Sequence, residues 1–388
     1  MLGNRANVEL PMKVLVFSGI LAAGMVALGQ QPQHQAISGD LQAPVSGVST
    51  GATAQGLRAF AAIEPIDTHA HVRRSDPAFN AMLDRLNLHL LDIILVNDQS
   101  PGQRDLASER SEALEFIRSS GGRAVLCTSI DPYKMHDPGF AGHAIRELNQ
   151  DFKQGAIAVK IWKNIGMEIK DADGHYVLPD DPAFAPIYRD IAAHNKTLVA
   201  HVADPDSAWA PPDPTSPDYS YYNENPFWYM YGKTDPASKQ QILKARDHIL
   251  EQNPGLRVVG AHLGSMESDF PLLAQHLDHY PNFAVDMAAR MAYLAKLPRA
   301  DAIAFIMKYQ DRLIYGTDLT FGANDQVQKK IDTWEQTYAR DWAFLATTDT
   351  VVVEGTTTKG LALPEDVLRK ILHDNAVHWF PGILGNAH

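Results

Sequence analysis

Short apolar runs alternate with amphipathic segments along most of the chain. Eight runs are rich in aliphatic and β-branched residues, have the length of strands and are bounded by polar or turn-forming residues. These runs predict strands over residues 65–72, 90–98, 123–131, 156–164, 197–204, 256–264, 282–290 and 312–320. Between them, apolar residues recur at helical spacing and predict helices over 108–120, 141–154, 185–195, 239–252 and 300–310.

This alternation predicts an α/β fold, with a (β/α)8 TIM barrel as the favoured architecture. A doubly wound open sheet is the alternative. That fold normally has a glycine-rich phosphate turn after an early strand, and the sequence contains none.

Two segments depart from the regular alternation. Residues 204–236 form a long insertion, rich in proline and aromatic residues, directly after the fifth predicted strand. Long loops of this kind usually act as lids or binding walls, so Trp228 is a candidate for substrate binding, although packing within the insertion is the alternative. The tail from Pro364 predicts one or two helices that close the barrel.

The first 57 residues differ in composition from the rest. Basic residues precede an apolar run over 14–29, which indicates a signal peptide over 1–29 and a periplasmic or secreted protein. An uncleaved membrane anchor is the alternative, and Met12 is an alternative start to Met1. Residues 30–57 are polar and small, and they predict a flexible linker to a barrel domain over 58–388.

Composition restricts the partners. The 388 residues carry a formal net charge of −12, and no long run of lysine or arginine appears. This argues against nucleic acid or an anionic membrane surface and for a small-molecule substrate; a monomer and a homo-oligomer both remain open. Cys127 is the one cysteine, so a disulfide within the chain is impossible.

Candidate chemistry lies at the ends of the predicted strands. His69 and His71 are two residues apart, so a regular strand places both on one side. His201, His262 and Asp318 stand late in the fifth, sixth and eighth strands. Because the strand ends of a TIM barrel surround one mouth, these side chains should converge there, and neutral imidazoles with a carboxylate suit a divalent metal.

These residues resemble the amidohydrolase superfamily, and within it the amidohydrolase-2 branch that includes aminocarboxymuconate-semialdehyde decarboxylase-like enzymes. The matching pieces, "DTHAH", "VKIWK", "AHVADP", "AHLGS", "YPNFAVDMAAR", "DRLIYGTD" and "ILHDNAVHWF", span about residues 60–380. The resemblance implies one divalent metal, most often zinc with manganese as the alternative, bound by His69, His71, His201 and Asp318. It also implies that Asp318 transfers the proton of a metal-activated water, and that His262 polarises the substrate carbonyl or stabilises an oxyanion.

Three cationic residues are further candidates for substrate binding. Lys160 and Lys163 lie on the fourth predicted strand, where a carboxylated lysine in some amidohydrolases bridges two metals; a charge or hydrogen-bonding role is favoured for this chain. Strand alternation predicts that at most one of the two points into the barrel. Arg290 is a candidate anchor for a substrate carboxylate, with an ion pair to Asp286 or another acid at the mouth as the alternative.

The main functional hypothesis is therefore a metal-dependent hydrolase of an amide, ester or lactone bond in a small molecule. Non-hydrolytic decarboxylation of an aromatic or unsaturated acid is the alternative within the same branch. A TatD-like nuclease is disfavoured because that family generally needs a glutamate on the fourth strand, where this chain has lysines. A non-catalytic binding protein is disfavoured because all five groups of the constellation are present.

Overall fold

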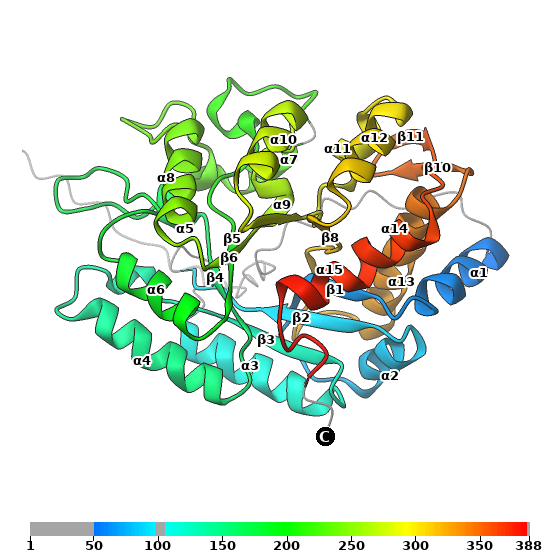
Figure 1. Ribbon diagram of the computed structural model, residues 1–388, viewed down its shortest axis with the longest axis horizontal. Coiled ribbons are helices and arrows are strands. Elements are labelled where there is room, and N and C mark those ends of the chain that lie inside the picture. Colours follow the sequence, from blue (N-terminus) through cyan, green and yellow to red (C-terminus); the bar gives the residue numbers. More distant parts are fainter. Residues whose placement is uncertain (1–49, 98–104, 217, 386–388) are drawn as a thin grey trace, which may run out of the picture. The chain divides into compact units, whose positions relative to one another are not determined.

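A closed parallel sheet forms the centre of the folded region. The computed structural model describes residues 50–97, 105–216 and 218–385. The strands are β1 (Ile66–Val72), β2 (His89–Ile93), β3 (Ala124–Ser129), β4 (Ala158–Ile161), β5 (Thr197–Ala200), β6 (Arg257–Gly260), β7 (Phe283–Asp286), β8 (Leu313–Ile314) and β9 (Leu319–Phe321). They pair in the order β8-β7-β6-β5-β4-β3-β2-β1-β9, and all of these pairings are parallel (Figure 1).

The eighth predicted strand closes the sheet in two pieces. β8 pairs with β7, whereas β9 pairs with β1. Residues 315–318 separate the two pieces, so one short stretch of chain joins the two edges. This confirms the predicted (β/α)8 barrel.

Helices cover the outside of the sheet. The five predicted helices are observed as α3 (Leu106–Ser119), α4 (Phe140–Lys153), α6 (Ala185–Ala193), α8 (Lys239–Gln252) and α12 (Arg299–Tyr309). The remaining α-helices are α2 (Pro77–Arg85), α5 (Asn164–Met167), α7 (Tyr219–Glu224), α9 (Ala261–Gly264), α10 (Phe270–His279), α11 (Met291–Lys296), α13 (Val327–Ala346), α14 (Glu365–Arg369) and α15 (Asn375–Trp379). In the described ranges, no helix combines the length and apolar character needed to cross a membrane.

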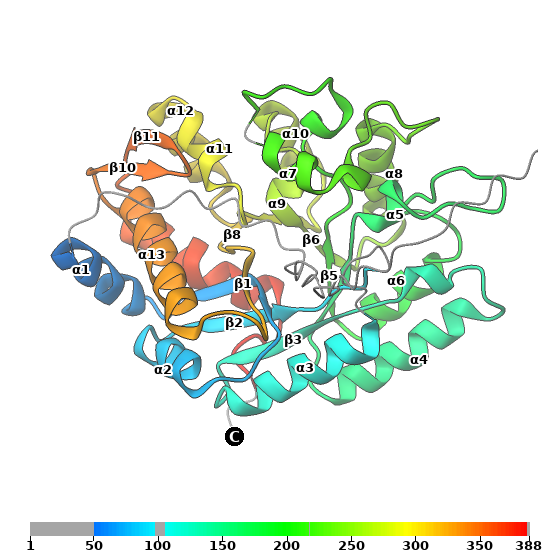
Figure 2. The same ribbon diagram turned by 180° about the vertical axis from the view of Figure 1, so that it is seen from behind.

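A helix at the start of the described region corrects one predicted boundary. α1 covers Thr50–Ala61, whereas the sequence predicted a flexible linker up to residue 57. The helix packs against α13, where the Phe60 ring stacks on Tyr338 at a centroid distance of 5.1 Å (Figures 1 and 2). This tertiary contact stabilises a segment whose composition alone favours disorder. The predicted signal peptide and residues 30–49 of the predicted linker lie outside the described residues.

The hairpin of β10 (Thr350–Val353) and β11 (Thr356–Lys359) was not predicted from the sequence. It contacts α11 and α13 on the outside of the barrel (Figure 2). Glu354 and Gly355 connect its strands with φ angles of 46° and 83°. Positive φ at both central residues is typical of the tight turns that join antiparallel strands.

One end of the barrel is closed by apolar side chains. Interior residues from all eight strand positions, such as Ile66, Leu91 and Val199, pack in one cluster with Trp379 and Phe380 of the tail. Two elements of the tail contact β8: α15, red in Figure 1, and the π-helical turn before it, Lys370–Asp374. The predicted closure by the C-terminal tail is therefore confirmed, and the opposite end is left for a site.

Candidate metal centre and active site

A β-bulge in β1 turns two histidines toward the barrel interior. Ile66 packs in the interior cluster, so regular alternation would send His69 and His71 outward. The pairing of β1 with β2 gains one residue between Asp67 and Ala70, and this reverses the alternation. Both histidines consequently face the mouth, as the sequence predicted, for a reason that the sequence did not show.

The Nδ1 atoms of both histidines are held by acceptors. His69 Nδ1 donates to Asp286 Oδ2 at 2.8 Å, and His71 Nδ1 donates to the Ile93 carbonyl oxygen at 2.7 Å. Since a neutral imidazole carries one N–H, these bonds leave Nε2 as a lone-pair donor on each ring. The Nε2 atoms lie 3.6 Å (His69) and 3.1 Å (His71) from Asp318 Oδ1.

Asp318 lies in the stretch between β8 and β9 and is fixed by its backbone. Its N–H donates to the His69 carbonyl oxygen at 2.7 Å, and its φ is 66°. The preceding Thr317 donates from both its backbone N–H and its hydroxyl to Asp67. A non-glycine residue at positive φ is uncommon and often marks a functional position, and here it aims the carboxylate at the two histidines.

His201 lies just past the end of β5. Its ring is 4.4 Å from that of His262 between centroids. Its Nε2 is buried without a hydrogen bond to any described residue, and Asp204 Oδ1 is the nearby carboxylate oxygen at 3.5 Å. An unbonded buried nitrogen is costly unless a ligand uses it, which is consistent with the predicted role of His201 as a metal ligand.

His262 follows β6 in a left-handed backbone conformation with a φ of 58°. Its backbone N–H donates to Asp286 Oδ1 at 2.8 Å, and its Nδ1 donates to the Ala288 carbonyl oxygen at 2.9 Å. The proton of the neutral ring therefore lies on Nδ1 and Nε2 is an acceptor. This corrects the predicted donor role toward a substrate carbonyl: His262 Nε2 is arranged to accept a proton.

The electrostatics of the mouth favour neutral histidines beside an ionised carboxylate. Burial lowers the pKa of His71 to about 4, and it lowers the pKa values of His201 and His262 well below their ordinary value. Burial alone would raise the pKa of Asp318, but the close contact with His71 and the nearby His262 and His69 hold that pKa well below its ordinary value.

The donor set fits a divalent cation. His71 Nε2 and Asp318 Oδ1 both present lone pairs at a separation of 3.1 Å, so a proton or a cation is needed between them, and the low pKa of His71 disfavours the proton. His69, His71 and Asp318 form a group whose ligand atoms are close enough to hold a metal ion. His201 stands outside that group and contributes the unbonded nitrogen described above.

Both lysines of the fourth strand region are buried near the mouth, contrary to the expectation that at most one points inward. β4 ends at Ile161, so alternation no longer applies at Lys163. Lys160 Nζ lies 3.2 Å from His69 Nε2. Lys163 Nζ donates to both carboxylate oxygens of Asp204 at 2.7 Å.

Two other predicted substrate-binding residues have different surroundings. The acid beside Arg290 is Glu267, whose Oε2 lies 3.8 Å from Arg290 Nε, and Asp286 is instead used by His69 and His262. The Trp228 side chain is fully buried and its ring packs against Trp162. It therefore offers no surface to a substrate in this structure; it packs against Trp162 after β4 and against Phe227 within the insertion, which is the packing role that was the alternative.

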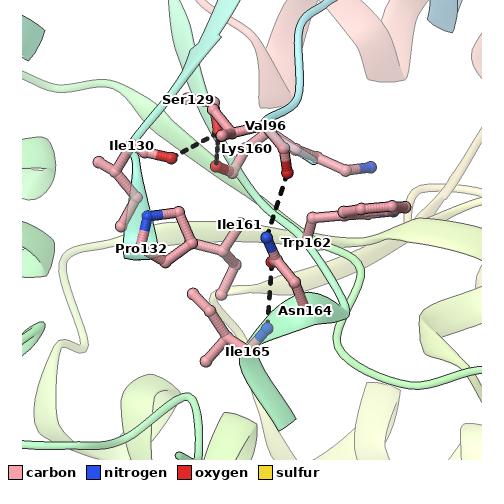
Figure 3. A pocket seen from close by; sticks show the side chains of 9 residues that line it. All are labelled: Val96, Ser129, Ile130, Pro132, Lys160, Ile161, Trp162, Asn164 and Ile165. Atoms are coloured by element: carbon pink, nitrogen blue, oxygen red, sulfur yellow. Dashed lines mark hydrogen bonds between the residues drawn. The ribbon is translucent and has the colours of Figure 1, made fainter. Parts of the chain in front are cut away.

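A small pocket lies beside Lys160, at the ends of β3 and β4 and the start of α5. Asn164 donates to the Val96 carbonyl oxygen at 3.1 Å, and Ser129 donates to the Lys160 carbonyl oxygen at 3.0 Å (Figure 3). Of the residues that line it, Lys160 alone is among the candidate site residues, and none is a histidine.

The sequence did not identify the residues that hold the candidate site residues in place. Asp286 was considered only as an ion-pair partner of Arg290, although its position at the end of β7 could have shown that it faces the mouth. Asp204 and Tyr221 lie in or beside the insertion, and their contact with Lys163 depends on how the insertion folds. No local pattern in the sequence indicates that contact.

The family model described as Amidohydrolase matches residues 130–382. The comparison with curated proteins gave no match.

Solved structures with some similarity include three decarboxylases. The first is 2,6-dihydroxybenzoate decarboxylase in complex with 2,6-dihydroxybenzoate, at 14% identity and a TM-score of 0.46, with 81% of this chain and 98% of that chain covered. The second is dihydroxybenzoic acid decarboxylase from Polaromonas sp. JS666 with manganese and 2-nitroresorcinol, at 13% identity and a TM-score of 0.48, with 81% and 96% of the two chains covered. The third is 5-carboxyvanillate decarboxylase from Sphingomonas paucimobilis, at 13% identity and a TM-score of 0.42, with 81% and 98% covered.

Proposed function

Because this chain belongs to the amidohydrolase family, we propose that it is a metal-dependent hydrolase of an amide, ester or lactone bond in a small molecule. The observation that carries the proposal is the convergence of His69 Nε2 and His71 Nε2 on Asp318 Oδ1, at 3.6 and 3.1 Å. Both nitrogens present lone pairs toward an ionised carboxylate, which is a cation site rather than a hydrogen-bonded cluster.

In this proposal His69, His71, His201 and Asp318 hold one divalent ion, with zinc as the first choice and manganese as the alternative. Such an ion lowers the pKa of a bound water toward neutrality and polarises a carbonyl oxygen. Asp286 fixes the His69 ring by accepting its Nδ1–H at 2.8 Å. Asp318 and His262 Nε2 are the proton acceptors at the mouth, because both are unprotonated in this environment.

Decarboxylation is the second candidate, and Arg290 is the observation that favours it. The Arg290 side chain is 11% exposed at the mouth, and its Nε is buried without a hydrogen bond to the described residues. The Arg290 guanidinium, whose Nε lies 3.8 Å from Glu267 Oε2 without a hydrogen bond, is a cation that suits the carboxylate of an acidic substrate. The same side chain could also anchor the carboxylate of a hydrolase substrate, so it does not decide the reaction.

Metal analysis tests the site before any substrate is known. We expect about one zinc or manganese ion per chain after purification, removal of the ion by a chelator, and its return on dialysis against either metal. Nearly two ions per chain would instead support the two-metal arrangement through Lys160. Failure of the intact protein to retain any divalent ion would reject the proposal.

The reaction is tested with the metal-loaded protein on a panel of lactones, esters, amides and aromatic acids. Hydrolysis incorporates one oxygen atom from isotopically labelled water into the product, which mass spectrometry detects. Release of carbon dioxide together with an organic product that carries no label identifies a decarboxylase. The chelated protein is the matched control for both readouts.

A further inference from the structure

The insertion after β5 contacts the barrel mouth through Lys163. The ammonium of Lys163 donates to Asp204 Oδ1, Asp204 Oδ2 and Tyr221 Oη, each at 2.7 Å. An ammonium has three protons, so these contacts use all of its donors. Lys163 is therefore saturated and cannot itself take a substrate group, which changes the role expected for it from the sequence.

Tyr221, on α7 of the insertion, is left with one free donor. Its oxygen accepts from Lys163, so its own O–H points elsewhere, and residues 50–97, 105–216 and 218–385 provide no acceptor for that proton. Burial is the main cause that raises the pKa of Tyr221 well above its ordinary value, with the charges of Asp204 and Asp318 acting in the same direction. The hydroxyl thus stays protonated and is a donor.

Its position is at the border of the proposed site. Tyr221 is half-buried, whereas Lys163 beneath it is 3% exposed. Asp204 Oδ1, which accepts from Lys163, also lies 3.5 Å from His201 Nε2. The Tyr221 hydroxyl is therefore separated from a proposed metal ligand by the Lys163–Asp204 pair alone.

Two neighbouring donors of the insertion are also unpaired. Tyr222 Oη and Trp228 Nε1 are buried without a hydrogen bond to any described residue. The Tyr221 and Tyr222 rings lie 5.2 Å apart, and the Trp228 ring lies 4.5 Å from Lys163 Nζ. Tyr222 and Trp228 are buried, so among these three side chains the half-buried Tyr221 is the one whose unused O–H can reach a substrate, and the partner of an O–H donor is an acceptor.

We infer that Tyr221 is a specificity-determining residue that donates a hydrogen bond to a second oxygen of the substrate. This oxygen lies away from the bond that reacts at His69, His71 and Asp318. Lys163 positions Tyr221 for the contact. The inference rests on the proposed function. It assigns the substrate class as carbonyl compounds that carry another acceptor oxygen on the side of the insertion.

The test uses hydroxamic acids, which bind divalent metals without turning over. The probes are straight-chain alkanohydroxamic acids and oxo derivatives of the same length that differ only in the position of a ketone. Binding to the zinc-loaded full chain is measured by titration calorimetry. We expect at least one oxo compound to bind about fivefold more tightly than its alkyl partner, and Tyr221→Phe to abolish that preference while binding of the alkyl compounds stays unchanged.

The matched control is Tyr229→Phe, which removes a hydroxyl from the same insertion. The Tyr229 hydroxyl donates to the Ala210 carbonyl oxygen, so its contact is internal to the insertion. This variant should keep the preference for the oxo compound. A loss of preference in both variants would assign the effect to folding of the insertion and would overturn the role of Tyr221.

Lys163→Met tests the positioning role. If Lys163 acts by orienting Tyr221, the single variants and the double variant should all lose the same preference, without additivity. Additive losses would show that Lys163 does not act through Tyr221.

The remaining outcomes separate this inference from the proposed function. Equal binding of all alkyl and oxo compounds to the wild type rejects the role of Tyr221 and leaves the metal site intact. Absence of hydroxamate binding to a protein that retains zinc means that the metal is not accessible to a substrate, and it rejects both.

Discussion

The two ends of the barrel are built from the same strands but differ in the hydrogen bonding of their buried polar groups. At the closed end, Asn375 Nδ2 donates to the carbonyl oxygens of Gln310 and Leu313 at 2.6 and 2.7 Å, and Thr197 donates to the Trp379 carbonyl oxygen. At the mouth, His201 Nε2 and Arg290 Nε are buried without hydrogen bonds to the described residues. The closed end has the features of a stability element, and the mouth has those of a site for ligands.

Positive φ angles at non-glycine residues occur at both ends of the barrel. His262, Ala289 and Asp318, which follow β6, β7 and β8, have φ angles of 58°, 51° and 66°, and Glu64, Asn87 and Asn195, which precede β1, β2 and β5, have φ angles of 57°, 49° and 55°. Such residues are destabilising unless their surroundings hold them. The two ends therefore differ in which side chains these positions carry: at the mouth, two of them place His262 and Asp318.

Loss of the Asp318 carboxylate should give the largest effect. Asp318→Asn keeps the size of the side chain, and asparagine tolerates positive φ, so the loss in the free energy of unfolding should stay well below that of a core truncation. The amide cannot accept the proton, so kcat/KM for a confirmed substrate should fall by about 10³-fold. Steady-state kinetics measure the change; an unchanged kcat/KM would show that Asp318 transfers no proton in the reaction.

The second prediction concerns the closed end. Trp379→Ala removes a buried ring from the interior cluster and should lower the free energy of unfolding by about 3–5 kcal/mol, measured by denaturant titration. The activity of the fraction that remains folded should be unchanged. Asp318→Asn is the reciprocal control, and a comparable loss of stability there would abolish the distinction between the two ends.

Asp92 on β2 sharpens the comparison because it is a buried carboxyl outside the constellation. Burial raises its pKa to about 7, against the lowering effect of Arg73, so the folded state binds the proton more tightly than the unfolded chain. Its contribution to stability is thus present below about pH 4 and is lost as the pH rises through about 7.

We expect Asp92→Asn to remove this pH dependence. Between about pH 4 and pH 8, the free energy of unfolding of the wild type should fall by about 4 kcal/mol relative to the variant, as followed by urea titrations at each pH. The Val72 N–H, which donates to Asp92 Oδ1 at 2.8 Å, keeps an acceptor in the variant. Parallel pH profiles would show that Asp92 is ionised in the folded state.

The smallest effect should come from the residue that orients a proposed ligand. Asp286→Asn weakens the hydrogen bond that orients the His69 ring through Nδ1, and it leaves all proposed ligands in place. Metal affinity should therefore fall by about 10–100-fold. Competition with a chromogenic chelator measures this affinity. A variant with wild-type affinity would mean that His69 is oriented without Asp286.

Much of the fold could be predicted because barrel strands are buried on both faces and stand out as apolar runs. The outlying hairpin was not recognised, since Glu354 and Gly355 form its turn without the asparagine or aspartate that usually marks one. The linker boundary was wrong because α1 is stabilised by α13, far along the chain. Such contacts leave no trace in the local sequence.

The site was predictable to the extent that position along a strand determines which end of the barrel a side chain reaches. This applied to His69, His71 and Asp318, which the structure brings together. It failed at Lys163, where the strand had already ended, and at His262, whose tautomer depends on the Ala288 carbonyl oxygen. Hydrogen-bond direction is a tertiary property, and residue type alone does not fix it.

The interruption between β8 and β9 has a practical consequence for how the protein loses activity. Residues 315–318, which join the two edges of the sheet, also carry the Asp318 carboxylate. The strands on either side, β8 and β9, have only two and three residues. Because local opening starts where few pairings hold a segment, we expect this segment to open on warming before the helical shell unfolds. Heat inactivation should then precede the melting transition, and a cross-link across this segment should delay it.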